Sequence, residues 1–94
     1  MTRVTVHLAA PLRVFAEGRS RVTLDAPAAT VAAAFEALWA ACPGVRDRVV
    51  TEQGEVRPHV SVFVGAESIR FTGGLRTPVP DGAEISILPA VSGG

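Results

Sequence analysis

The one long helical pattern in the chain is TVAAAFEALWAACPG, residues 30–44. Thr30 is expected to cap a helix, because its side-chain oxygen can accept a hydrogen bond from an otherwise free N–H of the first turn. Apolar side chains then recur at offsets of three and four residues, which places them on one helical face. These side chains are Val31, Ala34, Phe35, Leu38, Trp39 and Cys42. Pro43-Gly44 is expected to end the helix, since proline breaks the pattern and glycine tolerates a left-handed backbone.

Strand patterns precede this helix. Apolar and polar residues alternate over residues 3–8 and again over residues 21–25, as in half-buried strands. Residues 17–20 have the composition of a turn, so the two segments are expected to form a hairpin with a longer connection than a tight turn requires. After the helix, residues 45–50 could add a short helical turn, and residues 51–58 are expected to form a surface loop.

Three further strand patterns follow in the second half of the chain. The first covers residues 60–64, and Gly65-Ala66 suits a tight turn that leads into a short strand over residues 68–71. The last strand is expected over residues 84–87. Pro89 should end it, because proline has no N–H to donate to a neighbouring strand.

The order of these elements predicts the fold class. One main helix packed on one face of a mixed sheet is an α+β architecture. If the final strand returns beside the first, after an initial hairpin and a crossover helix, the fold is a β-grasp. We expect this domain over residues 1–88 and a flexible diglycine tail over residues 89–94.

Composition excludes several classes of protein. The chain has 94 residues, enough for one domain, and 48% of them are hydrophobic, which argues against disorder. Nine basic and nine acidic side chains cancel, so we expect neither a nucleic-acid partner nor a membrane partner. Cys42 is the only cysteine, which rules out an internal disulfide. With no signal peptide and no apolar stretch long enough to span a bilayer, we expect a cytoplasmic protein.

The chain ends in Val91-Ser92-Gly93-Gly94. Neither terminal glycine has a Cβ, so the carboxylate of Gly94 lies on the least hindered backbone available. Such a tail can thread a narrow channel into the active site of a partner, with Val91, Ser92 and Gly93 inside the channel. A carboxylate is a poor electrophile, so the terminus would need activation, for which adenylation by ATP is the obvious route. A frayed end or a truncated chain is the alternative interpretation.

The segment from residue 59 onward resembles the C-terminal half of the MoaD/ThiS sulfur carriers, which are ubiquitin-like β-grasp proteins. The resemblance rests on Leu75, Asp81-Gly82, Ile85, Ile87, Pro89 and Gly93-Gly94, because the turn, the strand and the diglycine all keep register. In element order it extends over essentially the whole chain. Within the family, residues 69–75 and the longer loop before His59 are most similar to the carrier of bacterial cysteine biosynthesis.

The resemblance implies a mechanism and a set of partners. An E1-like adenylyltransferase of the MoeB/ThiF type would adenylate the Gly94 carboxylate, and a sulfur donor would convert the adenylate into a thiocarboxylate. A sulfur-accepting synthase would then take the sulfur, and in the cysteine branch a metalloprotease would release the product. The chain itself would be a protein cosubstrate and not an enzyme. It would bind no cofactor, since ATP and magnesium are used by the activating partner.

Other functions remain open. The sulfur could instead go to a pterin, as in a molybdopterin-synthase small subunit, or to another specialised metabolite. The same activated terminus would serve a ubiquitin-like modifier that forms isopeptide bonds with lysines. A third possibility is an interaction module whose diglycine has no function.

Some side chains outside the tail are also candidates. Phe63 and Leu88 are expected on the sheet face opposite the helix, which in ubiquitin-like proteins docks partners.

Cys42 could relay a persulfide, although its place on the apolar helical face favours a buried structural role. His7 and His59 lie on separate strands with no other ligand nearby, so no metal site is expected. Gly73-Gly74 is expected to form a turn, since no phosphate-binding pattern accompanies it.

Overall fold

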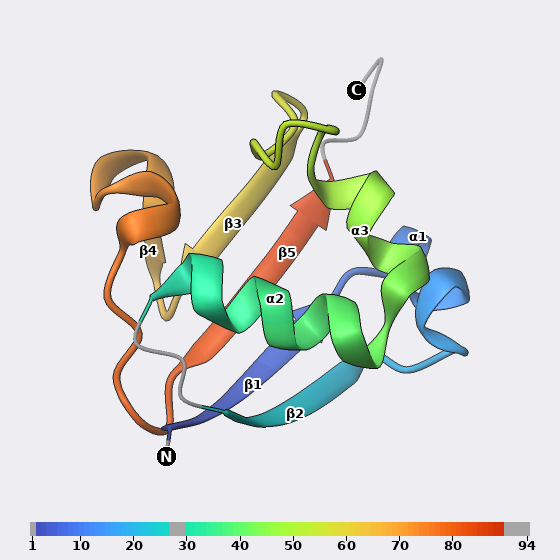
Figure 1. Cartoon of the computed structure of the whole chain (residues 1–94), viewed down its shortest axis with the longest axis horizontal. Coiled ribbons are helices and arrows are strands. Elements are labelled where there is room, and N and C mark those ends of the chain that lie inside the picture. Colours follow the sequence, from blue (N-terminus) through green and yellow to red (C-terminus); the bar gives the residue numbers. More distant parts are fainter. Residues whose placement is uncertain (1, 27–29, 90–94) are drawn as a thin grey trace.

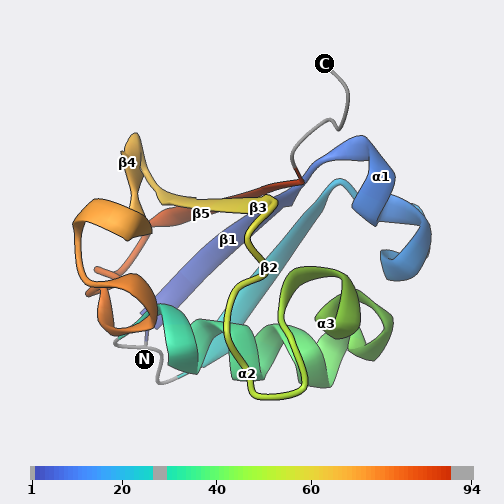
Figure 2. The ribbon, with the colours of Figure 1, turned by 90° about the horizontal axis from the view of Figure 1, so that it is seen from above.

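The computed structural model describes residues 2–26 and 30–89. In this part of the chain, a five-stranded sheet forms one layer, and helices α2 and α3 cover one of its faces (Figures 1 and 2). The strand order is β2-β1-β5-β3-β4. The strands are β1 (Thr2–Leu8), β2 (Arg21–Ala26), β3 (Val60–Val64), β4 (Glu67–Ser68) and β5 (Glu84–Pro89). This is the mixed sheet of the β-grasp, ubiquitin-like fold, as the sequence predicts.

The first and last long strands lie side by side at the centre of the sheet. β1 pairs with β5 in parallel, with Val6 opposite Ile85, whereas β2 and β3 flank this pair in antiparallel fashion. A parallel pair requires a crossover connection, and the chain makes it through α2 (Val31–Ala41). The predicted return of the final strand beside the first is therefore confirmed.

Helix α2 forms as its sequence pattern predicts. The side chain of Thr30 accepts a hydrogen bond from the backbone N–H of Ala33 at 3.3 Å and so caps the helix. Phe35 is buried in the core, and its ring centroid lies 5.0 Å from that of the half-buried Trp39. The predicted apolar face is thus the face that packs on the sheet.

Helix α2 ends before Pro43, and a short helical segment follows, both as the sequence predicts. Helix α3 (Pro43–Val49) follows after Cys42 alone, because proline suits the first turn of a helix as well as it ends one. Gly44 has no left-handed backbone, and the prediction for it was wrong. A Cβ at Gly44 would lie 3.2 Å from the carbonyl oxygen of Phe15, so glycine permits a close approach between α3 and the segment after β1.

Other short helical segments were not predicted. The β1–β2 connection contains α1 (Ala10–Arg13) and a 3-10 turn, η1 (Val14–Ala16). After β4 the chain forms η2 (Ile69–Phe71) where a strand was expected, and then η3 (Gly74–Arg76). The hydroxyl of Ser68 accepts a hydrogen bond from the N–H of Arg70 at 3.3 Å, which favours a turn at this point.

The alternation of the strands separates two faces of the sheet. The inner face packs against α2 and α3, and the side chains of Val6, Val62, Ile85 and Ile87 are buried there. We call the opposite side the outer face. Its residues are Arg3, Thr5, His7, Arg21, Thr23, Asp25, Ser61, Phe63, Glu84, Ser86 and Leu88.

Candidate functional site

The predicted reacting group lies outside the residues that the structure describes. Val91, Ser92, Gly93 and Gly94 all belong to the undescribed C-terminal segment. The structure does show where this segment begins. Pro89, which the sequence analysis placed in the tail, is the last residue of β5 and lies opposite the first residue of β3.

Phe63 and Leu88 lie together on the outer face, as their alternation predicts. Leu88 is opposite Ser61, and Phe63 is opposite Ser86, so the two apolar side chains are diagonal neighbours on adjacent strands. Leu88 is 45% exposed and Phe63 is half-buried. The pair is therefore partly accessible to solvent, mainly at Leu88. Its role in docking stays a prediction.

Four charged or titratable side chains elsewhere on the outer face are paired with one another. Nε of Arg3 donates to a carboxylate oxygen of Asp25 at 2.9 Å, and His7 pairs with Glu84. The hydrogen bond from Arg3 lowers the pKa of the Asp25 carboxyl below its ordinary value. These four side chains satisfy one another, whereas Phe63 and Leu88 form an apolar patch that is suited to a partner.

Cys42 is buried, as expected for a residue with a structural role. Its side chain is 3% exposed, and Nη2 of Arg19 donates to its Sγ at 3.1 Å.

His7 belongs to β1, whereas His59 precedes β3 and is exposed. Within residues 2–26 and 30–89, no group of three or more His, Cys, Asp or Glu could hold a metal ion. Among the same residues, no helix has the length and apolarity needed to cross a membrane.

The structure also reveals a hollow that the sequence analysis missed. It has a volume of about 400 Å³ and lies between β3, the loop before it, and the turns η2 and η3. Its apolar lining includes Val56, Val60, Val62, Ile69 and Leu75. No sequence spacing could have revealed this hollow, because its walls come from four separate segments. Nearby, Phe71 is 88% exposed at the end of η2.

The fold and the exposed apolar pair define a ubiquitin-like β-grasp protein, and comparison with known proteins specifies the family. Residues 6–94 match the ThiS family, so the chain belongs to the ThiS family. It is 36% identical to the sulfur carrier protein CysO of Mycobacterium tuberculosis over 93 residues, which cover 97% of this chain and 98% of that relative.

Solved structures agree with this assignment. The chain is similar to one in the crystal structure of the Amycolatopsis orientalis BexX/CysO complex, with a TM-score of 0.85, 35% identity and coverage of 97% and 99% of the two chains. It is also similar to the crystal structure of SAMP1 from Haloferax volcanii, with a TM-score of 0.84, 32% identity and coverage of 98% and 99%. The structural neighbours thus include both a sulfur carrier and a small archaeal modifier protein.

Proposed function

We propose that this protein is a sulfur carrier whose C-terminal carboxylate, on Gly94, is converted into a thiocarboxylate. The observation that carries the proposal is full-length similarity to CysO, a sulfur carrier protein, in a chain that ends in Gly93-Gly94. The chain acts as a protein cosubstrate and not as an enzyme. It needs no bound cofactor, since its partners supply the chemistry.

The reaction proceeds in two steps, both on partner enzymes. An E1-like adenylyltransferase uses ATP and magnesium, so that a carboxylate oxygen of Gly94 attacks the α-phosphate and pyrophosphate leaves. The resulting acyl-adenylate makes the terminal carbonyl electrophilic. A sulfur donor then attacks this carbonyl, AMP leaves, and the terminus becomes a thiocarboxylate.

The thiocarboxylate sulfur is the nucleophile of the next reaction. We infer that a sulfur-accepting synthase of cysteine biosynthesis receives it and that a metalloprotease releases the amino acid. Similarity to CysO supports this branch. A molybdopterin-synthase small subunit is a weaker candidate, because the structural neighbour named as a molybdopterin converting factor is 19% identical and so supports the fold alone.

A ubiquitin-like modifier is the second candidate function. The similarity to SAMP1 favours it, because SAMP1 is a small archaeal modifier protein. The activation step is the same, but the acyl group passes to the amine of a lysine and an isopeptide bond forms.

One incubation separates these functions. The protein is mixed with an E1-like adenylyltransferase from the same organism, ATP, magnesium and sulfide, and a cell extract is added to a parallel sample. A sulfur carrier gains the mass of one oxygen-to-sulfur exchange in intact-mass spectrometry. A modifier forms larger covalent adducts in the extract, whereas an unchanged mass in both samples contradicts both functions.

A further inference from the structure

Two arginines beside the hollow of about 400 Å³ are held in place by backbone carbonyls. Nη2 of Arg70, on η2, donates to the carbonyl oxygen of Pro58 at 2.8 Å. Nε of Arg57 donates to the carbonyl oxygen of Asp47 at 2.8 Å. Each guanidinium has five N–H donors, so these bonds fix the side chains and leave donors free for another molecule.

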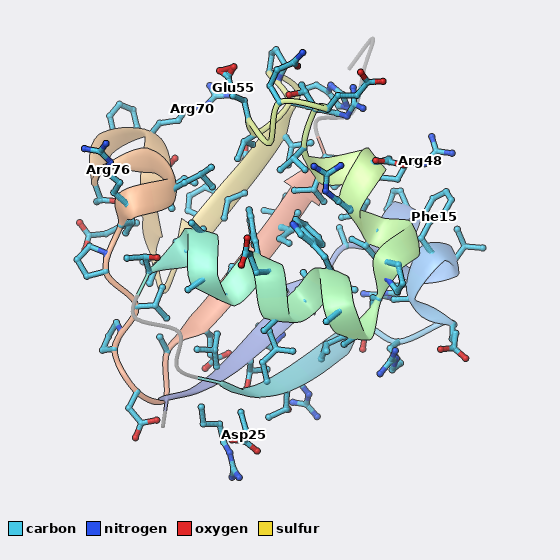
Figure 3. The ribbon with its side chains drawn as sticks, viewed as in Figure 1. Phe15, Asp25, Arg48, Glu55, Arg70 and Arg76 are labelled. Carbon is cyan, nitrogen blue, oxygen red and sulfur yellow. The ribbon has the colours of Figure 1, made fainter. Side chains whose placement is uncertain are left out.

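Arg48, on α3, lies close to Arg57, since both line a second, smaller hollow with Asp47 and His59. Its Cζ lies 4.4 Å from the ring centroid of Phe15, a geometry that holds the cation over an aromatic face without neutralising it. Figure 3 shows Arg70 between η2 and the loop before β3, and Arg48 on the other side of this loop, near α3 and above Phe15. We call Arg48, Arg57 and Arg70 the arginine row.

The cations of the arginine row have no carboxylate partner within the described part of the chain, where the ion pairs involve other residues. Two acidic side chains lie nearby. Asp47 pairs with Arg46 at 3.3 Å, and Glu55 lines the hollow. The row therefore carries a net positive charge, with its guanidinium groups already positioned. Arginine in fixed geometry is suited to bidentate recognition of carboxylates.

The hollow beside the row has an apolar floor. Val60 and Val62 of β3 and Ile69 of η2 are 1%, 2% and 4% exposed, and they contribute to its lining. The hollow is large enough to receive an apolar side chain, and a buried anchor of this kind surrounded by polar groups dominates the energy of many interfaces.

This surface lies next to the origin of the tail. Val60, on the floor of the hollow, is opposite Pro89, and residues 90–94 follow directly. A protein that receives the tail would therefore lie beside the hollow and the arginine row. The outer face, with Phe63 and Leu88, is a different surface of the same sheet.

We propose that the hollow and the arginine row dock an acidic segment of the activating enzyme, in which an apolar side chain fills the hollow and neighbouring carboxylates pair with Arg70 and Arg48. This inference rests on the proposed function, since it assigns a second contact to the partner that adenylates Gly94. It is carried by the unpaired, fixed guanidinium groups and by their position beside the origin of the tail.

The test compares matched charge reversals. Arg70→Glu and Arg48→Glu alter the row, whereas Arg21→Glu makes the same change on β2, which contributes no residue to the hollow. The KM and kcat for the carrier are measured from pyrophosphate release by an E1-like adenylyltransferase from the same organism, at low and high salt. Thermal unfolding verifies that each variant is folded.

We expect Arg70→Glu and Arg48→Glu to raise KM by about tenfold at low salt with kcat nearly unchanged, because the tail is intact and only docking is lost. The control variant Arg21→Glu should keep a KM within about twofold of the wild-type value, as most surface substitutions away from an interface do. The difference in KM between the row variants and the wild type should shrink at high salt, since salt screens exposed charges.

Two further variants separate charge from folding and from apolar contact. Arg70→Gln keeps a donor for the carbonyl of Pro58, so a raised KM in this variant is due to the missing charge. Val56→Phe fills part of the hollow without a change in charge and should also raise KM.

The outcomes are distinct. If Arg70→Glu behaves like Arg21→Glu, the docking proposal is wrong while the carrier function stands. If Val56→Phe leaves KM unchanged, no apolar side chain enters the hollow. If the wild type itself releases no pyrophosphate, the proposed function fails, and the docking proposal fails with it.

Discussion

Pro89, the last residue of β5, lies opposite Val60, the first residue of β3. This pairing fixes the position of the last residue before the segment 90–94. Five residues span about 17 Å when fully extended, so the position of the terminal carboxylate in a partner depends on the exact number of residues beyond Pro89. The length of the tail should therefore matter more than the identity of most residues in the domain.

Changing the tail by one residue should abolish activation. Deletion of Gly94 moves the carboxylate back by about 3.5 Å, and misplacement of this order can cost about 100-fold in rate. Addition of an alanine after Gly94 moves the carboxylate forward and adds a Cβ. We expect both variants to unfold at the temperature of the wild type and to form no acyl-adenylate in intact-mass spectrometry.

One result would contradict the requirement for a tail of exact length. An alanine-capped protein that acquires sulfur, and that mass spectrometry shows was not first trimmed by a protease, would mean that the terminus needs no exact placement.

The apolar pair on the outer face should contribute to docking and not to folding. Phe63→Asp or Leu88→Asp would place a charge at the centre of an interface, where desolvation makes it costly. We expect weaker binding of the activating or the accepting enzyme, by about tenfold or more, in surface plasmon resonance. Thr23→Asp, on the outer face but on β2, is the control and should bind normally. Equal binding by all three variants would argue that this face makes no contact with these enzymes.

Cys42 should be dispensable for sulfur transfer. Cys42→Ala removes one buried atom and the hydrogen bond from Arg19 to Sγ, which should lower the free energy of unfolding by about 1 kcal/mol. Thiocarboxylate formation by the folded variant should match that of the wild type. Loss of transfer in a folded Cys42→Ala protein would instead point to a persulfide relay.

Local sequence patterns predicted most of the fold. The three-and-four spacing of α2, the cap at Thr30 and the two-residue alternation of the strands all depend on neighbours within a few residues. The same alternation placed Phe63 and Leu88 on the correct face. The chemistry of a terminal carboxylate suggested only an activated terminus. The carrier hypothesis came from the resemblance of the segment from residue 59 onward to the MoaD/ThiS sulfur carriers, and not from any geometry.

Local sequence patterns did not predict features that depend on contacts between residues far apart in the chain. Gly44 is next to Phe15 only after folding, so its sequence context suggested a left-handed helix end. The η2 turn replaces a strand because Ser68 caps it and Ile69 enters the core. The hollow and the arginine row combine segments far apart in the chain, and no local pattern connects Arg48 with Arg70.

The ion pair between Arg3 and Asp25 should make stability depend on pH. Because Arg3 lowers the pKa of Asp25 in the folded state, the folded protein binds fewer protons at this site than the unfolded chain. Its contribution is present above the unfolded pKa of about 3.9 and is lost as the pH falls through the lower, folded pKa. Urea unfolding of wild type and Asp25→Asn between pH 6 and pH 2 should show a small difference that shrinks at the acidic end. A difference that grows toward low pH would contradict this assignment.

The most direct test of the proposed sulfur carrier function is to locate the sulfur atom after activation. The protein is incubated with the adenylyltransferase, ATP, magnesium and sulfide, and its C-terminal peptide is fragmented by tandem mass spectrometry. We expect one oxygen-to-sulfur exchange at the carboxyl of Gly94, with Cys42 unmodified. Sulfur on Cys42, or no sulfur on a peptide that ends in Gly94, would contradict it.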